Sequence, residues 1–539
     1  MRMKGSSRVV CLLVLAVSVI ASCGGGGGGG GVGGGGGGGT PPPVLPDAPQ
    51  DISATGANGK VTLAWSTVGG ASSYNIYTNT TGSVTTSDTL ISNATISYVH
   101  TGRTNGVTYY YRVSAVSSTG EGPLSNEVSA KPIPYSEMVQ KIAAGDSQAD
   151  DYFGYSVSIS GDYAIVGGTG DPLSDAGAAY IFHRTGTSTW DAGTKITAPD
   201  AQVGDYFGCS VSISGDYAIV GAYGESGGAG DPKPYAGAAY IFHRTGTNTW
   251  DTGTKIISPD ASAADDFGYS VSISGNYAIV GANGTGWSNE GAAYIFHSTG
   301  TNTWDAGTKI ISPDAQANDW FGVSVSISGD YAIVGAWWED GGAGDPLSDA
   351  GAAYIFHRTG TNTWNTGTKI VAPDAQADEW FGASVSINGD YAIVGAHLED
   401  GGAGDPLPDK GAAYIFYRTA TNTWDAGTKI MPPDAQGNNY FGYSVSISGD
   451  YAVIGAYAHL ESDGTGDAIP GAGAAYIFHR TGTNTWDFEN KITAPDAWDY
   501  DYFGYSVSIS GAYVIVGAYM EDGGAGNPLT DAGAAYLFY

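Results

Sequence analysis

Charged residues, and basic residues above all, are scarce in this sequence. Only 14% of its 539 residues are charged, and 21 lysine and arginine residues stand against 53 aspartate and glutamate residues, for a formal net charge of −32. So acidic a chain is repelled by nucleic acid and by anionic lipid surfaces. We therefore expect no nucleic-acid partner, whereas cationic partners and metal ions stay open.

Cysteine is rarer still, with three residues in the whole chain. Cys11 and Cys23 lie near the N-terminus, which excludes a disulfide framework for the rest of the sequence. Cys209 stands where two similar segments carry Tyr155 and Tyr269. A lone thiol in such a position predicts a buried, unreactive side chain.

Catalytic motifs are lacking as well. The sequence contains no nucleophile elbow, no phosphate-binding loop and no zinc-spaced set of histidine and cysteine residues. Acidic residues are numerous, but no asymmetric pair stands out for acid–base chemistry. We therefore expect no enzyme activity and no required cofactor.

Glycine and aromatic residues are abundant instead. The chain has 86 glycines, 36 tyrosines and 13 tryptophans, a mixture typical of short strands joined by tight turns. Its length suggests two or three folded units beside targeting and linking segments.

Residues 1–22 have the features of a secretion signal, with basic residues ahead of an apolar run from Val9 to Ala21. The run ends in Ile-Ala-Ser-Cys at residues 20–23, which resembles the lipobox of bacterial lipoproteins. The resemblance implies cleavage before Cys23, lipidation of its sulfur and, because Gly24 rather than aspartate follows, the outer membrane or surface of a Gram-negative cell. Ordinary cleavage that leaves a spare cysteine is the alternative.

Residues 23–46 form the expected tether, because a glycine-rich stretch cannot bury apolar surface and the prolines at 41–43 stiffen its far end. Residues 47–134 alternate apolar and polar residues between turns, as in Lys60–Trp65 and Tyr109–Ala115. The segment resembles a fibronectin type III domain, which implies a tyrosine corner at Tyr109 and a role as a spacer.

Residues 137–539 repeat one unit seven times. The anchor of the unit is Phe-Gly followed by Ser-Val-Ser-Ile, at Phe153, Phe207, Phe267, Phe321, Phe381, Phe441 and Phe503. Each copy predicts four antiparallel strands, for example FGYSVSIS, DYAIVGA, GAAYIFHR and TWDAGTKI. The expected fold is all-β, with a seven-bladed β-propeller of four-stranded antiparallel blades behind a small fibronectin type III-like β-sandwich.

The two ends of the repeat array complement each other. The last copy stops at Tyr539, after its third strand, and residues 138–142 match the missing fourth strand. We therefore expect residues 138–142 to complete the seventh blade and close the ring.

The repeats resemble the FG-GAP family, which includes the blades of integrin α-chain propellers. The Phe-Gly pairs and the Val-Gly-Ala segments, as at residues 220–222 and 334–336, carry the resemblance. The family often places an aspartate-rich calcium loop between the first two strands, whereas only the short turn at residues 160–162 stands there in this chain.

Acidic residues gather in the connections between the second and third strands, which a four-stranded blade places on one face. We take these acids and two neighbouring tryptophans as candidate ligand-binding or calcium-binding residues: Glu339, Asp340, Asp345, Asp349, Glu399, Asp400, Asp405, Asp409, Glu521, Asp522, Asp531, Trp337 and Trp338. Aspartates that serve only turn formation are the alternative. The third-strand histidines occupy one position in different blades, so they predict no metal cluster, and the tryptophans of the fourth strands predict packing between blades.

The sequence thus predicts a lipid-anchored adhesion or ligand-binding module whose partner is an extracellular protein or polysaccharide. The alternatives are a hydrolase or lyase acting on extracellular polysaccharide, and a purely structural envelope protein.

Overall fold

The computed structural model describes residues 44–57, 59–132, 135, 138–170, 176–186, 188–226, 233–285, 289–340, 347–400, 408–462, 467–522 and 529–539. Cys23, Asp345 and Asp405 lie outside the described residues, as do the expected signal segment and most of the tether. Every regular element within the described ranges is a β-strand. In this part of the chain no helix is long and apolar enough to cross a membrane.

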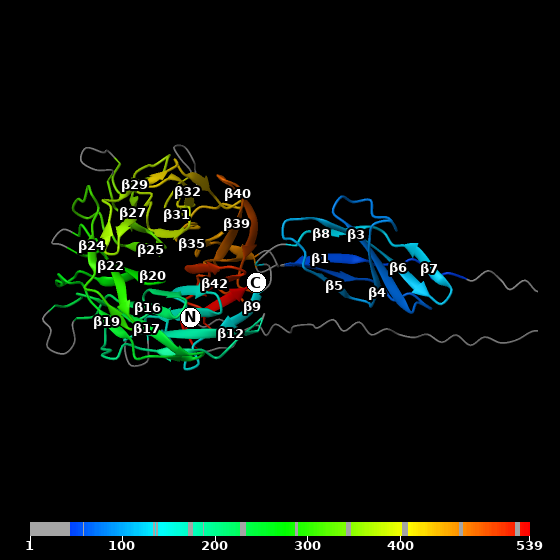
Figure 1. Ribbon diagram of the computed structural model, residues 1–539, viewed down its shortest axis with the longest axis horizontal. Coiled ribbons are helices and arrows are strands. Elements are labelled where there is room, and N and C mark those ends of the chain that lie inside the picture. The colour runs from blue at the N-terminus through cyan, green and yellow to red at the C-terminus, as the bar shows by residue number, and fades with distance from the viewer. Residues whose placement is uncertain are drawn as a thin grey trace, which may run out of the picture.

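The N-terminal unit consists of two antiparallel sheets (Figure 1). One contains β1 (Ser53–Ala57), β2 (Lys60–Ala64) and β5 (Tyr98–Thr101), and the other contains β4 (Thr89–Ala94), β3 (Ser73–Asn79), β6 (Tyr109–Ser117), β7 (Gly120–Leu124) and β8 (Val128–Ala130). Alternate residues of β2 and β6, such as Leu63 and Val113, are buried between the sheets. The hydroxyl of Tyr109 accepts the N–H of Thr104 at 3.1 Å, as a tyrosine corner does.

Seven similar sheets follow, and we number them in chain order. The first strand of each is an edge strand that begins just after a Phe-Gly pair or, in the third sheet, at its phenylalanine: β10 (Ser156–Ser160), β15 (Val211–Ser214), β20 (Phe267–Ser274), β25 (Ser324–Ser328), β30 (Ser384–Asn388), β35 (Ser444–Ser448) and β41 (Ser506–Ser510). The second strands are almost wholly buried: β11 (Tyr163–Gly168), β16 (Tyr217–Ala222), β21 (Tyr277–Ala282), β26 (Tyr331–Ala336), β31 (Tyr391–Ala396), β36 (Tyr451–Ala456) and β42 (Tyr513–Ala518).

The third strands pair with the second strands along their apolar halves: β12 (Ala178–Gly186), β17 (Ala238–Gly246), β22 (Ala292–Gly300), β27 (Ala352–Gly360), β32 (Ala412–Ala420), β39 (Ala474–Gly482) and β43 (Ala534–Phe538). A small hairpin of β37 (Glu461–Ser462) and β38 (Ala468–Ile469) lies in the sixth sheet's second-to-third connection. The first three strands of the repeat are therefore confirmed.

The fourth strand differs from the prediction, because five sheets divide it into two short strands that both pair with the third strand. The pieces are β13 (Thr189–Trp190) and β14 (Thr194–Ile196), β18 (Thr249–Trp250) and β19 (Thr254–Ile256), β23 (Thr303–Trp304) and β24 (Thr308–Ile310), β28 (Thr363–Trp364) and β29 (Thr368–Ile370), and β33 (Thr423–Trp424) and β34 (Thr428–Ile430).

A side-chain hydrogen bond explains the division. In the first sheet, Asp191 Oδ1 accepts the backbone N–H groups of His183 and Gly193, both at 3.0 Å, and Gly193 has φ of 77°. In the sixth sheet Glu489 replaces this glycine, and β40 (Thr485–Ile492) runs unbroken. An L-residue other than glycine rarely adopts the left-handed conformation, so the glycine decides whether the strand is divided.

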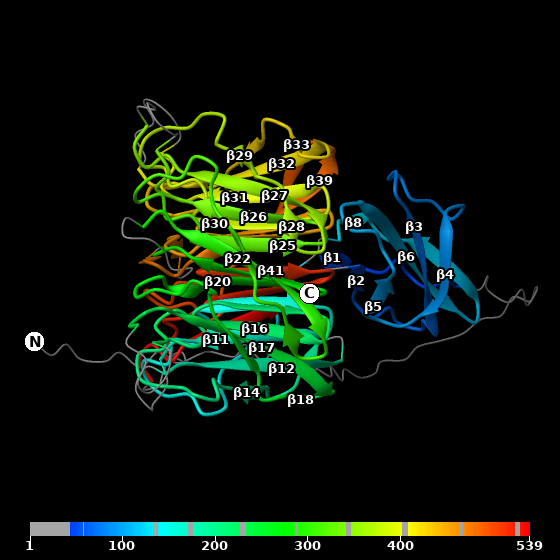
Figure 2. The same cartoon turned by 60° about the vertical axis from the view of Figure 1, so that its left-hand side comes forward.

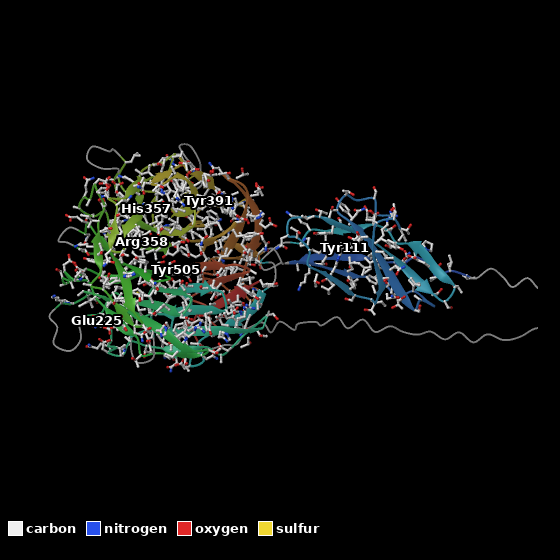
Figure 3. The ribbon with its side chains drawn as sticks, in the orientation of Figure 1. Tyr111, Glu225, His357, Arg358, Tyr391 and Tyr505 are labelled. Atoms are coloured by element: carbon white, nitrogen blue, oxygen red, sulfur yellow. The ribbon has the colours of Figure 1, made fainter. Side chains whose placement is uncertain are left out.

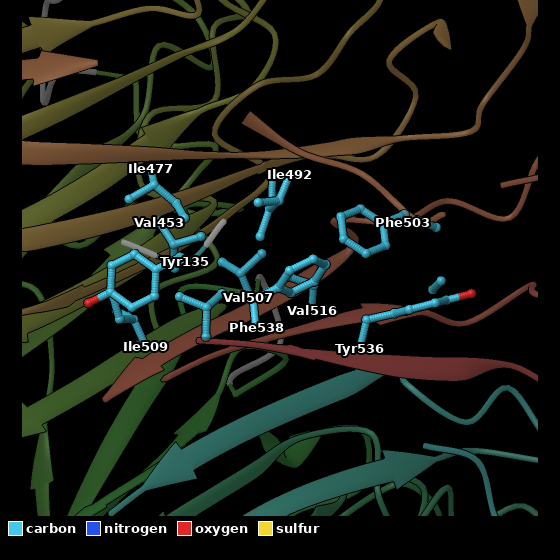
Figure 4. Close-up of a cluster of buried hydrophobic side chains, with 14 of the residues drawn as sticks. Tyr135, Val453, Ile477, Ile492, Phe503, Val507, Ile509, Val516, Tyr536 and Phe538 are labelled. Atoms are coloured by element: carbon cyan, nitrogen blue, oxygen red, sulfur yellow. The ribbon is translucent and has the colours of Figure 1, made fainter. Parts of the chain in front are cut away.

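The seventh sheet takes its fourth strand from the other end of the array. Strand β9 (Met138–Ile142) pairs antiparallel with β43, with Ile142 opposite Ala535. The predicted pairing of residues 138–142 is confirmed. Tyr135, just before β9, is 2% exposed and packs in the cluster between the sixth and seventh sheets (Figure 4).

Hydrogen bonds from serine side chains connect successive first strands. The Ser156 hydroxyl donates to the Gly208 carbonyl at 2.9 Å, and Ser158 Oγ accepts the N–H of Ile213 at 3.2 Å. The second type of bond recurs at all seven junctions, including the one from Ile159 N–H to Ser508 Oγ that joins the first sheet to the seventh. Contacts between first strands thus run from sheet to sheet and from β41 back to β10.

Glycines explain the close approach of neighbouring sheets. A Cβ on Gly167, in the Val-Gly segment of β11, would lie 2.0 Å from the carbonyl oxygen of Gly208, which follows Phe207. Phe207 itself is fully buried, with its ring 5.5 Å from that of Tyr240 and 6.1 Å from that of Phe242. The two motifs therefore form one contact, in which backbone lies against backbone.

At the end of the sheets where the turns between third and fourth strands lie, aromatic side chains form contacts between neighbouring sheets. The Arg244 guanidinium lies 4.7 Å from the ring centroid of Tyr163 in the preceding sheet and donates to its hydroxyl at 3.0 Å. The Trp250 ring meets the same tyrosine edge-on at 6.2 Å, which confirms the predicted packing of these tryptophans between sheets. His183 lies 4.8 Å from Tyr163, so this histidine packs on a tyrosine of its own sheet.

Replacing a glycine of the Val-Gly segment should destabilise the sheets. The Cβ of Gly335→Ala would lie 2.0 Å from the carbonyl oxygen of Gly382, and overpacking of this kind costs about 1–3 kcal/mol. Gly145→Ala is the matched control, because nothing lies within 4 Å of its added Cβ. Chemical denaturation should show a lower free energy of unfolding for the first variant only, and equal values for the two would contradict this account of the motif.

Candidate ligand-binding face

The opposite end of the sheets, where second-to-third connections and inter-sheet connections lie, carries a repeated polar cluster. In the fourth sheet the Tyr354 hydroxyl donates to Asp314 Oδ1 at 2.7 Å, and Lys369 Nζ lies 2.9 Å from Asp314 Oδ2. The same Tyr–Asp–Lys arrangement occurs in all seven sheets. The lysine and the tyrosine hydroxyl together hold the pKa of Asp314 below its usual value, against the opposing effect of burial.

Three predicted ligand residues belong to these clusters. Glu339 and Glu399 lie 2.6 Å from Lys369 and Lys429, and Glu521 lies 2.8 Å from Lys141. All three glutamates are at most 2% exposed. The sequence suggests loop carboxylates open to a ligand, whereas the structure buries these three against lysine ammonium groups.

The other predicted acids that the structure describes lie at the surface, in pairs within one connection. Asp340 Oδ1 accepts the backbone N–H of Asp349 at 2.9 Å. The same bond joins Asp400 to Asp409 at 2.8 Å and Asp522 to Asp531 at 2.9 Å. Burial, and then the partner aspartate, raise the pKa of Asp349, Asp409 and Asp531.

No metal centre is evident in the part of the chain that the structure describes, where no group of three or more His, Cys, Asp or Glu side chains is placed to hold an ion. In the buried clusters a lysine ammonium provides the positive charge that a cation would provide. The possible binding of calcium stays a prediction.

A second buried acid adjoins several clusters and was not among the predicted site residues. Asp319 Oδ2 accepts the N–H of Gln316 at 2.6 Å. Burial, with a smaller contribution from Glu339, raises the pKa of Asp319 to about 7. Burial also raises the pKa of Glu379 and of Asp501 to about 7, with smaller contributions from neighbouring acids. The signal for these residues is their place one residue ahead of the aromatic that precedes Phe-Gly.

Aromatic rings form an unbroken series of contacts on this face, which we call the aromatic crescent. Its members come from the positions before Phe-Gly and after Val-Gly-Ala: Trp320, Trp337, Trp338, Trp380, His397, Tyr440, Tyr457, Tyr502, Tyr519 and Tyr152. Ring centroids in contact along the crescent lie 5.1–6.2 Å apart, for example 5.2 Å between Trp337 and Trp380. All but the buried His397 are half-exposed.

The sequence indicated Trp337 and Trp338, and the structure brings both into the crescent. The sequence did not single out the tyrosines of the crescent, because a residue just before Phe-Gly looks like an ordinary loop residue. The signal was the recurrence of an aromatic there in every copy except the third, which has Asp266.

A cavity of about 300 Å³ lies inside the crescent, lined by the starts of all seven first strands. Its wall includes Tyr155, Tyr443 and Tyr505, and Tyr505 lies near the middle of the seven sheets whereas Glu225 lies nearer their periphery (Figure 3). Cys209 lines the same cavity and is buried as expected, and burial raises its pKa to about 11.

The seven sheets correspond to a known repeat. Residues 137–182, 190–242, 250–296, 304–356, 364–416, 424–478 and 486–538 each match the FG-GAP repeat. The chain belongs to the FG-GAP repeat family. The Phe-Gly pairs that name the repeat are the residues that form the contacts between neighbouring sheets described above.

The N-terminal unit of this FG-GAP repeat protein is Fn3-like. A Fn3-like protein from Clostridium thermocellum is 32% identical and covers 17% of this chain and 95% of that chain, with a TM-score of 0.14. The amylopullulanases of Thermoanaerobacter thermohydrosulfuricus and Thermoanaerobacterium saccharolyticum are 48% and 39% identical over 91 and 90 residues. Each match covers 16% of this chain, and only 6% and 7% of the enzymes' own lengths.

The three acids whose pKa is raised to about 7, Asp319, Glu379 and Asp501, should make the protein less stable as the pH rises. A carboxyl group with a pKa of about 7 in the folded state and an ordinary value of 3.8 or 4.5 in the unfolded state binds its proton more tightly when folded. Stability therefore falls between about pH 4 and pH 7 for these groups. Asp319→Asn should make that slope shallower, since one of the groups that lose a proton in this range is removed. Thermal unfolding from pH 4.5 to pH 8 measures it, and an unchanged slope in the variant would contradict the assignment.

Proposed function

We propose that this chain is a lipid-anchored, seven-bladed β-propeller of a bacterial envelope that binds an extracellular polysaccharide through the aromatic crescent. The main support for the proposal is the crescent, because half-exposed aromatic rings in contact with one another form a surface on which sugar rings stack. The exposed Asp340 and Asp400 lie in the connections that begin with the crescent residues Trp337 and His397, and they offer acceptors for sugar hydroxyls.

Contacts between the first and last sheets support a closed propeller. Strand β9 supplies the last strand of the seventh sheet, and the Ser506 hydroxyl donates to the Gly154 carbonyl of the first repeat at 2.8 Å. The Arg184 guanidinium lies 4.8 Å from the ring of Tyr513, as Arg244 does from Tyr163. The junction between the seventh and first sheets thus has the same contacts as the other junctions.

Binding without catalysis fits the chemistry of the acids. A catalytic acid–base pair needs two carboxyl groups that reach the substrate with different protonation states. The buried Glu339, Glu399 and Glu521 are each committed to a lysine. The exposed aspartates occur as three similar pairs, with no single pair distinguished from the others.

The arrangement of the units fits display from a membrane. In Figure 2 the short strands β28 and β33 lie toward the end of the ring beside the N-terminal unit, and β29 lies toward the other end, where the candidate face is. A lipid on Cys23 and the segment up to residue 46 would place the Fn3-like unit between the membrane and the ring. The partial matches to two amylopullulanases are compatible with a carbohydrate partner.

Loss of two tryptophans should weaken polysaccharide binding. In the double variant Trp337→Ala and Trp380→Ala, two rings whose centroids are 5.2 Å apart disappear from the crescent. Stacking of an aromatic ring contributes about 1 kcal/mol or more, so we expect at least a tenfold loss of affinity on a polysaccharide array and in affinity electrophoresis. Tyr235→Ala, which removes an exposed tyrosine of the second sheet's connection, is the control. Equal binding by the double variant and the control would contradict the proposal.

Replacement of the lipidated cysteine tests the anchor separately. Cys23→Ala should abolish incorporation of labelled palmitate and move the protein from the membrane fraction to the soluble fraction. Cys11→Ala is the matched control and should leave both unchanged. A variant at Cys23 that still carries lipid would exclude this residue as the anchor.

A further inference from the structure

The third sheet departs from the others in its polar cluster. Lys309 lies 2.6 Å from Asp260, and this is its single carboxylate partner among the described residues. Five other sheets give the equivalent lysine a second carboxylate, namely Glu225, Glu339, Glu399, Glu461 and Glu521. In the third sheet Thr285 stands where Glu225 and Glu339 stand in theirs. Its hydroxyl donates to the Ala282 carbonyl at 2.8 Å, within its own turn.

A cavity lies where the second carboxylate is missing. It has a volume of about 610 Å³, and its wall includes Lys309, Asp260, Asp265, Ser262, Thr285 and Asn289. The Lys309 side chain is 36% exposed, against 21–31% for the equivalent lysines of the other sheets. The ammonium group is thus more open to the outside here than in any other sheet.

The other sheets show which chemistry suits this place. Four of them hold a glutamate carboxylate 2.6–2.9 Å from the lysine, in a position that is at most 2% exposed. We propose that the cavity of the third sheet binds the carboxylate of a hexuronate, a sugar acid, against Lys309, where the other sheets hold their glutamate.

The size and wall of the cavity fit a sugar acid better than a bare carboxylate. Pockets for small molecules usually measure about 300–1,000 Å³, and 610 Å³ is well within that range. Ser262, Thr285 and Asn289 bring two hydroxyls and an amide to the wall, and these groups donate to and accept from the hydroxyls of a pyranose ring. The site is separate from the aromatic crescent, so it stands independently of the polysaccharide proposal.

Binding should be coupled to protonation of Asp265. This buried carboxyl group faces Asp260, Lys309 and Lys233, and burial raises its pKa. In the fourth, fifth and seventh sheets the equivalent acid next to the glutamate has a pKa of about 7. A second carboxylate arriving beside Asp265 will raise its pKa further, so affinity should fall with rising pH, by at most about tenfold per pH unit for one coupled proton.

Calorimetric titration of the full chain carrying Cys23→Ala with D-glucuronate tests the proposal. We expect saturable binding of glucuronate at pH 6, weaker binding at pH 8, and at least tenfold weaker binding of D-glucose, which lacks the carboxylate. Lys309→Met should abolish glucuronate binding.

Thr285→Glu is the decisive variant, because it gives Lys309 the intramolecular carboxylate that the other sheets have. It should abolish glucuronate binding without lowering the thermal midpoint. Binding that survives in this folded variant would overturn the proposal, as would N-acetylglutamate that binds as tightly as glucuronate. The double variant of Trp337 and Trp380 should bind glucuronate as the parent does, so failure here is distinguishable from failure of the polysaccharide proposal.

Discussion

The hydrogen bonds between neighbouring first strands are the interactions on which the rest of the structure depends. Each first strand is the edge of its sheet, and an edge leaves backbone N–H and C=O groups without a ladder partner. Serine side chains take the place of that partner, as when Ser158 accepts the N–H of Ile213. The alternating residues of the same strands, such as Val157 and Ile159, are buried in the cores between sheets. One short motif therefore satisfies the strand edge and fills the core.

This arrangement restricts where the seven copies can differ. At each junction a glycine carbonyl of one sheet lies against a glycine of its neighbour, and a side chain at either position would displace a backbone. The Tyr–Asp–Lys clusters restrict the fourth strands and inter-sheet connections in the same way, because each joins a lysine of a fourth strand to a third-strand tyrosine and an aspartate of an inter-sheet connection. The positions free to change are those at the ends of the second strands and at the starts of the Phe-Gly segments. Those positions carry the aromatic crescent.

Much of the fold could be predicted from the sequence, because the same pattern of strands and turns occurs seven times. The end of the array at Tyr539 and the matching segment at residues 138–142 predicted a pairing that the structure contains. The division of the fourth strand could not be predicted from the hydrophobic pattern, since it depends on the left-handed Gly193, whose N–H donates to the Asp191 side chain.

The candidate site was less predictable, for a similar reason. Glu339 belongs to an acidic, glycine-rich connection, and nothing in that connection shows that Lys369, 30 residues farther along the chain, lies 2.6 Å away. Burial of the glutamate is a consequence of the pairing of a distant strand. Asp340 and Asp349, which do reach the surface, lie in the same connection as Glu339 but are hydrogen-bonded to each other. The sequence placed these acids on one face, and the tertiary contacts decided which of them are exposed.

The divergence of the third sheet follows from the same restriction. Its strands keep the residues that contact the neighbouring sheets, with Phe267 buried and Ser270 donating to the Gly322 carbonyl at 2.8 Å. Yet it has Asp266 in place of the aromatic before Phe-Gly, and Thr285 in place of the glutamate. Neither change disturbs a junction, and both lie on the face that carries the crescent and the cavity. Near-identical sheets present the same chemistry, and the third sheet departs from the others at positions that the junctions leave free.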